Sequence, residues 1–392
     1  MKVNLAEQII DDTDISELVE WIQNTDRFTK GPETAKFEEE WSNYIGSKFS
    51  VFVNSGSSAN LLMFLAMLYS NKLKNKKVIV PAVSWVTTVS PAIQLGFEPI
   101  LCDCDADNLG LSVEHFESLC RQYNPSSAIL VHVLGHSPEM KAIKEICEKY
   151  DVTLLEDTCE APGSILDGKK LGTFGLASSF SFFYGHQMST IEGGMVSTDD
   201  RDFYNLLLSL RSHGWLRDNE EYFRKKYLNK YNISDFESNY FFVLPGLNVR
   251  STDLNAFLGR NQLKKMDSFV EKRNNNHNRF HDTLKDEFWT QTSETEIVSS
   301  LGFALMTPNR RKVVADLTKN KIECRPLICG SIQEHPFWTA TKPFISRFER
   351  RYLPVADRVH RNGLYVPCHQ NMTDKEVDFI CDVLLSSIKE KK

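Results

Sequence analysis

The fold is decided by Ser179-Phe-Ser-Phe-Phe-Tyr-Gly-His186-Gln-Met-Ser-Thr-Ile-Glu192-Gly-Gly-Met-Val196. This segment predicts a strand, a tight turn and a second strand. The side chain at the turn matters most, because the imidazole of His186 can move protons near neutral pH. His186 is therefore a candidate for proton transfer.

On the N-terminal side of this segment, short apolar runs alternate with helical stretches. The runs are typical of buried strands in a mostly parallel sheet, and they lie at 51–53, 78–80, 99–102, 128–132 and 153–156. Residues 175–198 add two strands without a full helix between them, so the sheet is predicted to be mixed. The alternation stops near Gly246, and a helix over 252–267 is expected to lead into a second domain. We predict a large α/β domain over 1–248, which includes N-terminal helices, and a smaller C-terminal α+β domain over 249–392.

Composition is that of a cytoplasmic metabolic enzyme. The 392 residues are 25% charged and 41% hydrophobic with a net charge of −6, which favours a folded protein that does not bind nucleic acid. The N-terminus has no apolar signal region, and no window approaches 18 uninterrupted apolar residues, so no membrane association is expected. The nine cysteines are an odd number without regular spacing, which indicates reduced thiols and no metal site.

Two polar segments stand out as binding sites. Asn54-Ser-Gly-Ser-Ser-Ala-Asn60 follows a strand and begins a helix, and free amides there can bind an anion, although simple helix capping is an alternative interpretation. Asp157 comes at the carboxyl end of an apolar strand, where ligands of open α/β sheets bind, although it too could cap the next helix.

The chain resembles the DegT/DnrJ/StrS sugar aminotransferases over about residues 25–385. Five motifs in the family's order carry the resemblance: Ser-Gly-Ser-Ser-Ala-Asn, Pro-Ala-Val-Ser-Trp, Glu-Asp-x-x-Glu, Ser-Phe-x5-Glu-Gly-Gly and Gly-x-Asn-x-Arg. The family implies an aspartate aminotransferase-like (type I) fold, pyridoxal 5′-phosphate (PLP) and its amine form pyridoxamine phosphate (PMP) as cofactor, and a homodimer with shared active sites. His186 stands at the family's cofactor lysine, so the cofactor is expected to be held non-covalently and His186 to be the catalytic base.

The resemblance also implies a set of binding residues. Ser57, Ser58 and Ser181 match phosphate ligands, and Asn248 matches an asparagine that reaches the phosphate of the neighbouring subunit. Asp157 matches the carboxylate that pairs with the pyridine nitrogen.

Three further residues are expected around the cofactor ring and the substrate. Trp85 would stack on the ring, although a core tryptophan is the alternative. Glu160 stands where most members carry Gln, and an acid beside the cofactor's phenolic oxygen should be neutral or paired. His213 is expected to bind the donor's carboxylate or a sugar hydroxyl, with a surface histidine equally compatible.

The reaction stays open between three functions. The first is transfer of an amino group from L-glutamate to a carbonyl sugar of lipopolysaccharide, favoured in the form that makes 8-amino-3,8-dideoxy-manno-octulosonate. The second is 3-dehydration of a nucleotide sugar, GDP-4-keto-6-deoxymannose; the dehydratases usually show two consecutive histidines, and here Gln187 replaces the second. The third is a regulator that has lost catalysis. The sugar itself cannot be deduced, and neither can substrate contacts of Arg250, His369 or the loop over 216–240.

Overall fold

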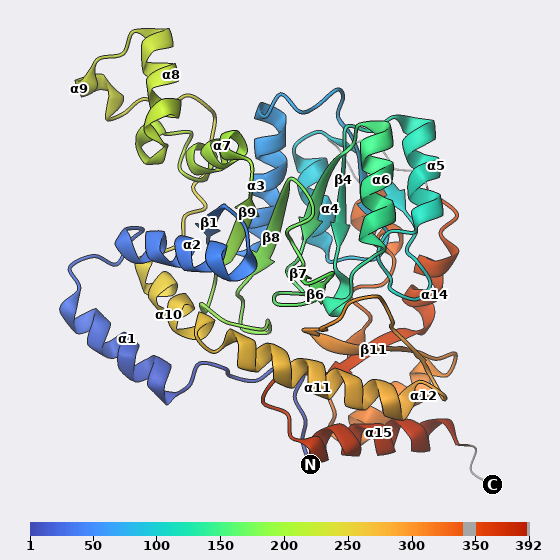
Figure 1. Cartoon of the computed structure of the whole chain (residues 1–392). Coiled ribbons are helices and arrows are strands. Elements are labelled where there is room, and N and C mark those ends of the chain that lie inside the picture. Colours follow the sequence, from blue (N-terminus) through green and yellow to red (C-terminus); the bar gives the residue numbers. More distant parts are fainter. Residues whose placement is uncertain (340–349, 390–392) are drawn as a thin grey trace.

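The computed structural model describes residues 1–339 and 350–389, which form α/β layers around a seven-stranded sheet (Figure 1). The strand order is β1 (Phe49–Val53), β9 (Gly194–Thr198), β8 (Ala177–Ser181), β5 (Thr153–Asp157), β4 (Ser127–Val131), β2 (Lys77–Pro81) and β3 (Glu98–Cys102). The five strands from β8 to β3 pair in parallel, whereas β9 pairs antiparallel with both β8 and β1. The prediction of a mixed, mostly parallel sheet is therefore confirmed.

Helices cover both faces of this sheet, which explains why β2, β3 and β4 are mostly apolar. One face packs against α3 (Gly56–Tyr69), α4 (Val86–Gln94) and α7 (Arg201–Arg211), and the other against α5 (Val113–Tyr123) and α6 (Met140–Tyr150). Successive side chains of β2 show the alternation, since Val78 and Val80 join the first layer and Ile79 joins the second.

A second, antiparallel sheet lies in the C-terminal part of the chain. Its strand order is β10 (Trp289–Thr290), β11 (Gly302–Met306), β13 (Gly363–Pro367) and β12 (Arg325–Pro326). The helices of this part are α11 (Met266–Leu284), α12 (Arg310–Lys319), α13 (Pro336–Thr339), α14 (Pro354–Asn362) and α15 (Asp374–Ile388). The expected helix over 252–267 is wrong in its bounds, because α10 (Asp253–Leu263) ends before the longer α11 begins.

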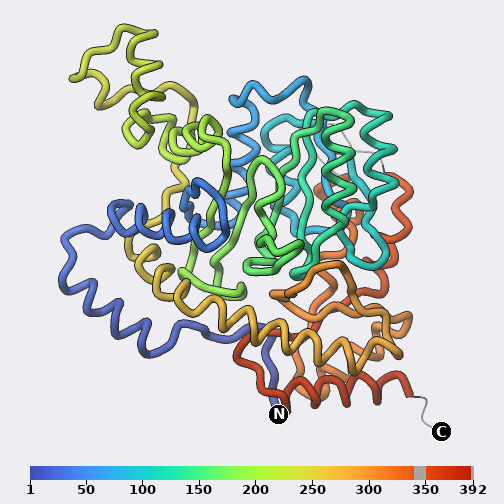
Figure 2. The backbone as a smooth tube through the Cα atoms, viewed as in Figure 1, coloured from blue at the N-terminus to red at the C-terminus, as the bar shows by residue number. Residues whose placement is uncertain are grey.

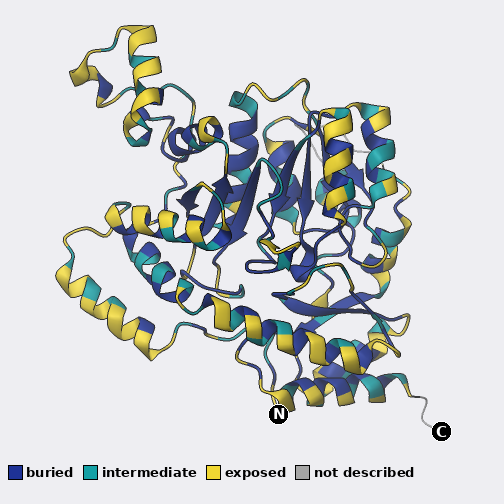
Figure 3. Cartoon of the chain, in the orientation of Figure 1, coloured by how far each residue is buried: buried dark blue, intermediate teal, exposed yellow. Residues whose placement is uncertain are grey.

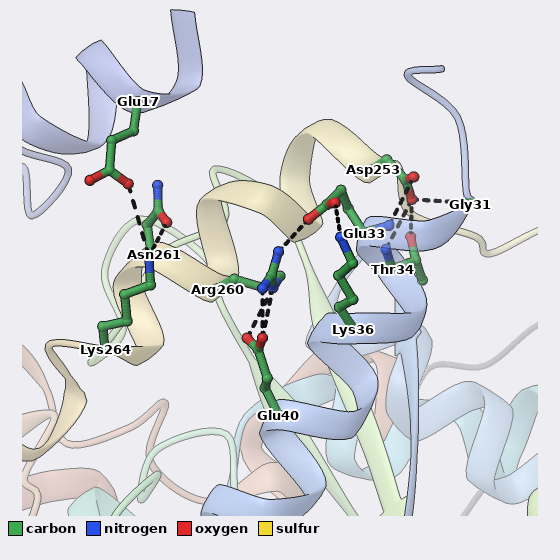
Figure 4. Close-up of polar contacts among 10 residues, drawn as sticks. All are labelled: Glu17, Gly31, Glu33, Thr34, Lys36, Glu40, Asp253, Arg260, Asn261 and Lys264. Atoms are coloured by element: carbon green, nitrogen blue, oxygen red, sulfur yellow. Dashed lines mark hydrogen bonds and ion pairs between the residues drawn. The ribbon is translucent and has the colours of Figure 1, made fainter. Parts of the chain in front are cut away.

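The N-terminal helices α1 (Asp12–Asn24) and α2 (Pro32–Ile45) pack against α10. Asp253 accepts hydrogen bonds from the backbone amides of Gly31, Glu33 and Thr34 at 2.7, 3.1 and 3.0 Å (Figure 4). It thereby caps the start of α2, whose first amides have no partner within the helix. Arg260 adds ion pairs from α10 to α2, at 2.5 Å to Glu33 and 2.7 Å to Glu40.

The first residues of the chain lie against the C-terminal part of the molecule, as the tube view shows (Figure 2). Val3 donates its amide to the Lys321 carbonyl at 3.0 Å and accepts from the Glu323 amide at 3.0 Å, and its side chain joins the core of that part. How the chain divides into domains stays a prediction.

The segment after α7 projects from the body of the molecule. It carries α8 (Glu221–Tyr231) and α9 (Asp235–Ser238), and most of its surface is exposed (Figure 3). No helix within 1–339 or 350–389 is long and apolar enough to cross a bilayer.

Candidate active site

The predicted site residues come together mainly at one edge of the large sheet. β1, β8, β5 and β4 run in the same direction, so their carboxyl ends meet there, next to the first turn of α3. Polar side chains at this edge of an α/β sheet are well placed to bind a ligand.

The first turn of α3 forms the anion-binding part of the edge. Ser55 caps the helix by accepting the Ser58 amide at 3.0 Å, while the amides of Gly56 and Ser57 precede it at the open end. Ser181 comes so close that a Cβ on Gly56 would lie 2.6 Å from the Ser181 Cβ, so only glycine permits this approach. The structure thus places Ser57, Ser58 and Ser181 around one helix N-terminus.

Asp157 is buried at the end of β5, with three hydrogen-bond donors around its carboxylate. Its Oδ2 accepts from Asn60 Nδ2 and Thr88 Oγ1, both at 2.7 Å, and its Oδ1 accepts from the Cys159 amide at 3.1 Å. No Lys or Arg side chain of the described residues pairs with it. A buried carboxylate without a cation leaves room for a positively charged ligand group, such as a pyridinium N–H.

Glu160 differs from Asp157 in its charge state. Burial raises the pKa of Glu160 to about 8, with the Leu134 amide lowering it and Asp157 raising it further. The carboxyl group is therefore protonated near neutral pH, as expected for an acid beside a negatively charged oxygen. Its Oε2 accepts from the Leu134 amide at 2.9 Å.

His186 lies in the turn between β8 and β9, half-buried, with its Nδ1 buried and without a partner among the described residues. Burial lowers the pKa of His186 to about 4; the nearby Cys159 backbone and the charge of Asp157 oppose this effect, whereas Arg273 adds to it. The net effect keeps the imidazole neutral at pH 7, so it can accept a proton.

Trp85 precedes α4 and exposes 54% of its surface. It is therefore not the core tryptophan of the alternative interpretation, and a flat ligand could stack on it. The adjoining backbone is held from the C-terminal part of the chain, since the Cys329 thiol donates to the Ser84 carbonyl at 2.8 Å.

His213 and Asn248 lie together but apart from the residues above. Ser212 forms a β-bridge with Asn248, the His213 amide donates to the Leu247 carbonyl at 2.6 Å, and both side chains are exposed. Asn248 Oδ1 accepts from Arg250 Nε at 3.0 Å. Within the described residues of one chain, no hydrogen bond or ion pair joins either side chain to Asp157, Glu160 or His186.

Sequence reasoning missed the residues that hold the predicted ones. Asn60 follows Ser57 by one helical turn, and Thr87 and Thr88 come shortly after Trp85. Their proximity to the two motifs is the signal that could have identified them as site residues. Thr87 Oγ1 accepts from the Ser57 hydroxyl at 3.0 Å. Arg273 contacts the His186 backbone from α11, and no local pattern in the sequence indicates it.

The site as a whole fits a pyridoxal phosphate. It offers hydroxyls at a helix N-terminus for a phosphate, an unpaired carboxylate for a pyridinium, an exposed tryptophan for the ring and a neutral acid for an oxyanion. Among residues 1–339 and 350–389, no group of histidines, cysteines and acids could hold a metal ion.

Comparisons with known proteins agree with this geometry. A sequence profile of the DegT/DnrJ/EryC1/StrS aminotransferase family matches residues 9–385. The chain is 34% identical over 378 residues to a GDP-4-keto-6-deoxy-D-mannose 3-dehydratase of Yersinia pseudotuberculosis, covering 93% of this chain and 94% of that protein. It is 27% identical over 380 residues to a GDP-perosamine synthase of Caulobacter vibrioides, covering 93% and 91%. The solved structure of the E. coli GDP-4-keto-6-deoxy-D-mannose-3-dehydratase with bound hydrated PLP superposes with a TM-score of 0.87 at 32% identity, covering 98% of this chain and 100% of that one.

Proposed function

This chain belongs to the DegT/DnrJ/EryC1/StrS aminotransferase family, and from that premise we propose that it is a 3-dehydratase of GDP-4-keto-6-deoxymannose. The observation that carries the proposal is the 34% identity to a 3-dehydratase over almost the full length of both chains. The sequence resemblance favours formation of an amino-octulosonate from an 8-oxo octulosonate, but the names of the relatives above do not support that substrate. All of them point to a GDP-linked sugar.

The cofactor of this sugar-modifying enzyme is PLP or its amine form, PMP. Ser57, Ser58 and Ser181 would hold the phosphate, Asp157 the pyridine nitrogen, and Trp85 one face of the ring. When bound, the cofactor supplies an electron sink that stabilises negative charge on a carbon attached to it. Protonated Glu160 would donate a hydrogen bond to the phenolic oxygen, which an ionised carboxylate would repel.

His186 would move the proton on which the reaction depends. In its neutral form the imidazole could accept a proton at the C4′ position of a bound cofactor and return it later in the reaction. Glutamate supplies the two electrons that replace the C3–O bond by C3–H. The balanced outcome is the 3-deoxy sugar, 2-oxoglutarate and ammonia.

The residue after His186 does not argue against dehydration. Gln187 is fully buried, and its Nε2 donates at 2.7 Å to the carbonyls of both Glu160 and Ser299. Its side chain therefore holds the turn against the rest of the protein. The absence of a second histidine there removes no exposed proton donor or acceptor from the site.

Amination of a GDP-linked 4-keto sugar is the second candidate, because a GDP-perosamine synthase matches 93% of this chain. Both reactions need glutamate and the same proton transfer. They differ in what happens at sugar carbons 3 and 4, which the cofactor-binding residues do not decide.

Product analysis separates these functions. The enzyme, loaded with PLP, is incubated with L-glutamate and either GDP-4-keto-6-deoxymannose or an 8-oxo octulosonate. We expect turnover of the GDP sugar to a product without the C3 oxygen, and one ammonia per 2-oxoglutarate by mass spectrometry and an ammonia assay. Nitrogen in the sugar product, without free ammonia, would show amination instead. No product from either substrate would favour the regulator.

We further propose a homodimer with shared sites. Asn248 and His213 are exposed, and large apolar side chains around the His186 turn, namely Phe183, Tyr184 and Ile191, are exposed as well. An exposed apolar patch of this kind indicates a protein interface. In a twofold dimer Asn248 would reach the phosphate of the neighbouring site, and His213 would contact the donor or the sugar there.

Complementation tests the shared site. We expect Asn248→Ala and His186→Ala chains to be inactive alone, and an equimolar mixture that has exchanged subunits to regain about a quarter of the parental activity, since half of the dimers carry one intact site. Activity of the mixed dimers and their mass are measured together. Mixed dimers that form without regaining activity would place both residues in the same chain's site.

A further inference from the structure

Arg273 of α11 is a buried arginine directed at the His186 turn. Its side chain is 1% exposed and donates to three backbone carbonyls, at 3.3 Å to His186, 2.7 Å to Ser300 and 3.3 Å to Cys368. Its Nε donates to Gln370 Oε1 at 2.7 Å. One guanidinium thus connects the turn between β8 and β9 to the C-terminal part of the chain.

No carboxylate compensates this charge. Among the described residues Arg273 forms no ion pair, and every acceptor that it contacts is neutral. Burial lowers the pKa of Arg273 to about 10, so the group stays charged at neutral pH. Because a buried unpaired charge is unfavourable, a neutral side chain would be expected here if packing were its only role.

A second hydrogen bond holds the carbonyl of the next residue, Gln187. Gln370 Nε2 donates to the Gln187 carbonyl at 3.2 Å, while its Oε1 accepts from Arg273. The carbonyls of His186 and Gln187 are therefore both held by one Arg273–Gln370 pair. Together with the Gln187 side chain, this pair holds the His186 backbone in place.

The charged groups around His186 come from two sides. Asp157 at the end of β5 favours a charged imidazole, and Arg273 on α11 opposes it. The titratable side chains that adjoin Arg273 are the Cys368 thiol, and His369, whose own pKa falls to about 4 through burial and the charge of Arg273. At neutral pH neither is charged, and the nearest carboxylate on the C-terminal side is that of Glu376, which acts on His369.

We propose that Arg273 is a positioning residue that fixes the His186 turn together with Gln370, and that its uncompensated charge adds to burial in disfavouring a charged imidazole. This inference rests on the proposed role of His186 as the base. The Arg273 side chain acts both through its charge and through its hydrogen bonds, and different substitutions at this position separate the two effects.

The test is a titration of His186 in the cofactor-free protein by NMR of histidine ring carbons. The chain has ten histidines, and the signal that disappears in His186→Asn identifies the right one. With its pKa near 4, the parent imidazole should be almost wholly neutral at pH 5. In Arg273→Met a clearly larger fraction of it should be protonated at pH 5, because removal of a nearby like charge favours the charged imidazole.

Two further variants divide the effect. Arg273→Lys keeps the charge but loses most of the guanidinium hydrogen bonds. The titration of His186 should therefore stay parental. The enzyme with bound cofactor should turn over more slowly, with an unchanged pH profile. Arg279→Met removes a cation of the same helix that pairs with Asp378 on the surface, and should change neither the titration nor turnover.

A parental His186 titration in folded Arg273→Met would overturn the proposal, whatever happens to activity. If Arg273→Met does not fold, Gln370→Glu replaces it, since a carboxylate against the guanidinium compensates the charge and should also raise the pKa of His186; an unchanged titration there would equally contradict the proposal. Because the readout needs neither cofactor nor substrate, its result is independent of whether the enzyme dehydrates or aminates.

Discussion

Replacement of His186 by asparagine is expected to lower turnover by roughly 10²- to 10⁴-fold, the usual contribution of a positioned general base. Asparagine keeps a polar side chain of similar size but cannot take a proton at neutral pH. Cofactor and glutamate should still bind nearly as in the parent, because neither is attached through the imidazole. In stopped-flow absorbance, the change that marks conversion of PLP to PMP by glutamate should slow by the same factor.

The matched variant is His186→Lys, which restores an amine able to bond the PLP aldehyde. It should show the absorbance of a covalently attached cofactor, and borohydride should fix the cofactor to this variant but not to the parent. If His186→Asn forms PMP from PLP and glutamate at the parental rate, His186 only fills the pocket. His213 of the neighbouring chain would then be the first alternative base.

The second large effect is expected for Asp157→Asn. The change is isosteric, and it removes the negative charge that would pair with the pyridine nitrogen while the space around it stays filled. Loss of such a preorganised electrostatic partner typically costs roughly 10²- to 10³-fold in turnover, or about 3 to 4 kcal/mol. Turnover and the absorbance of bound cofactor measure the effect, with cofactor saturation checked separately.

Asp253→Asn provides the control for loss of a buried carboxylate. Asp253 is 1% exposed and caps α2 through hydrogen bonds from Gly31, Glu33 and Thr34, so the variant should lower the melting temperature and leave turnover of the folded enzyme near the parental value. Turnover of Asp157→Asn equal to the parent's would mean that Asp157 only orders Asn60 and Thr88.

Much of the fold follows from the local sequence. The apolar runs at 78–80, 99–102, 128–132 and 153–156 correspond to parallel strands, with only His132 beyond the end of its strand, because strands buried on both faces are rich in apolar residues. The helix bounds after residue 252 were harder to predict. α10 ends at Leu263 and α11 begins at Met266, and nothing in the polar sequence between them indicates a break as strongly as a proline or glycine would.

The tertiary structure alone decided the states of the groups that do chemistry. The sequence by itself placed His186 after a strand and Asp157 at the end of another, and their motif order indicated the family and its cofactor. That His186 is neutral, that Glu160 is protonated near pH 7 and that Asp157 lacks a cation follow from burial and from neighbours distant in sequence. Arg273, which holds the His186 carbonyl, is 87 residues away from it along the chain. Hydrophobic periodicity and turn residues are local properties, so a sequence reveals them; solvation and Coulomb energies depend on which distant segments meet, and only the folded chain determines that.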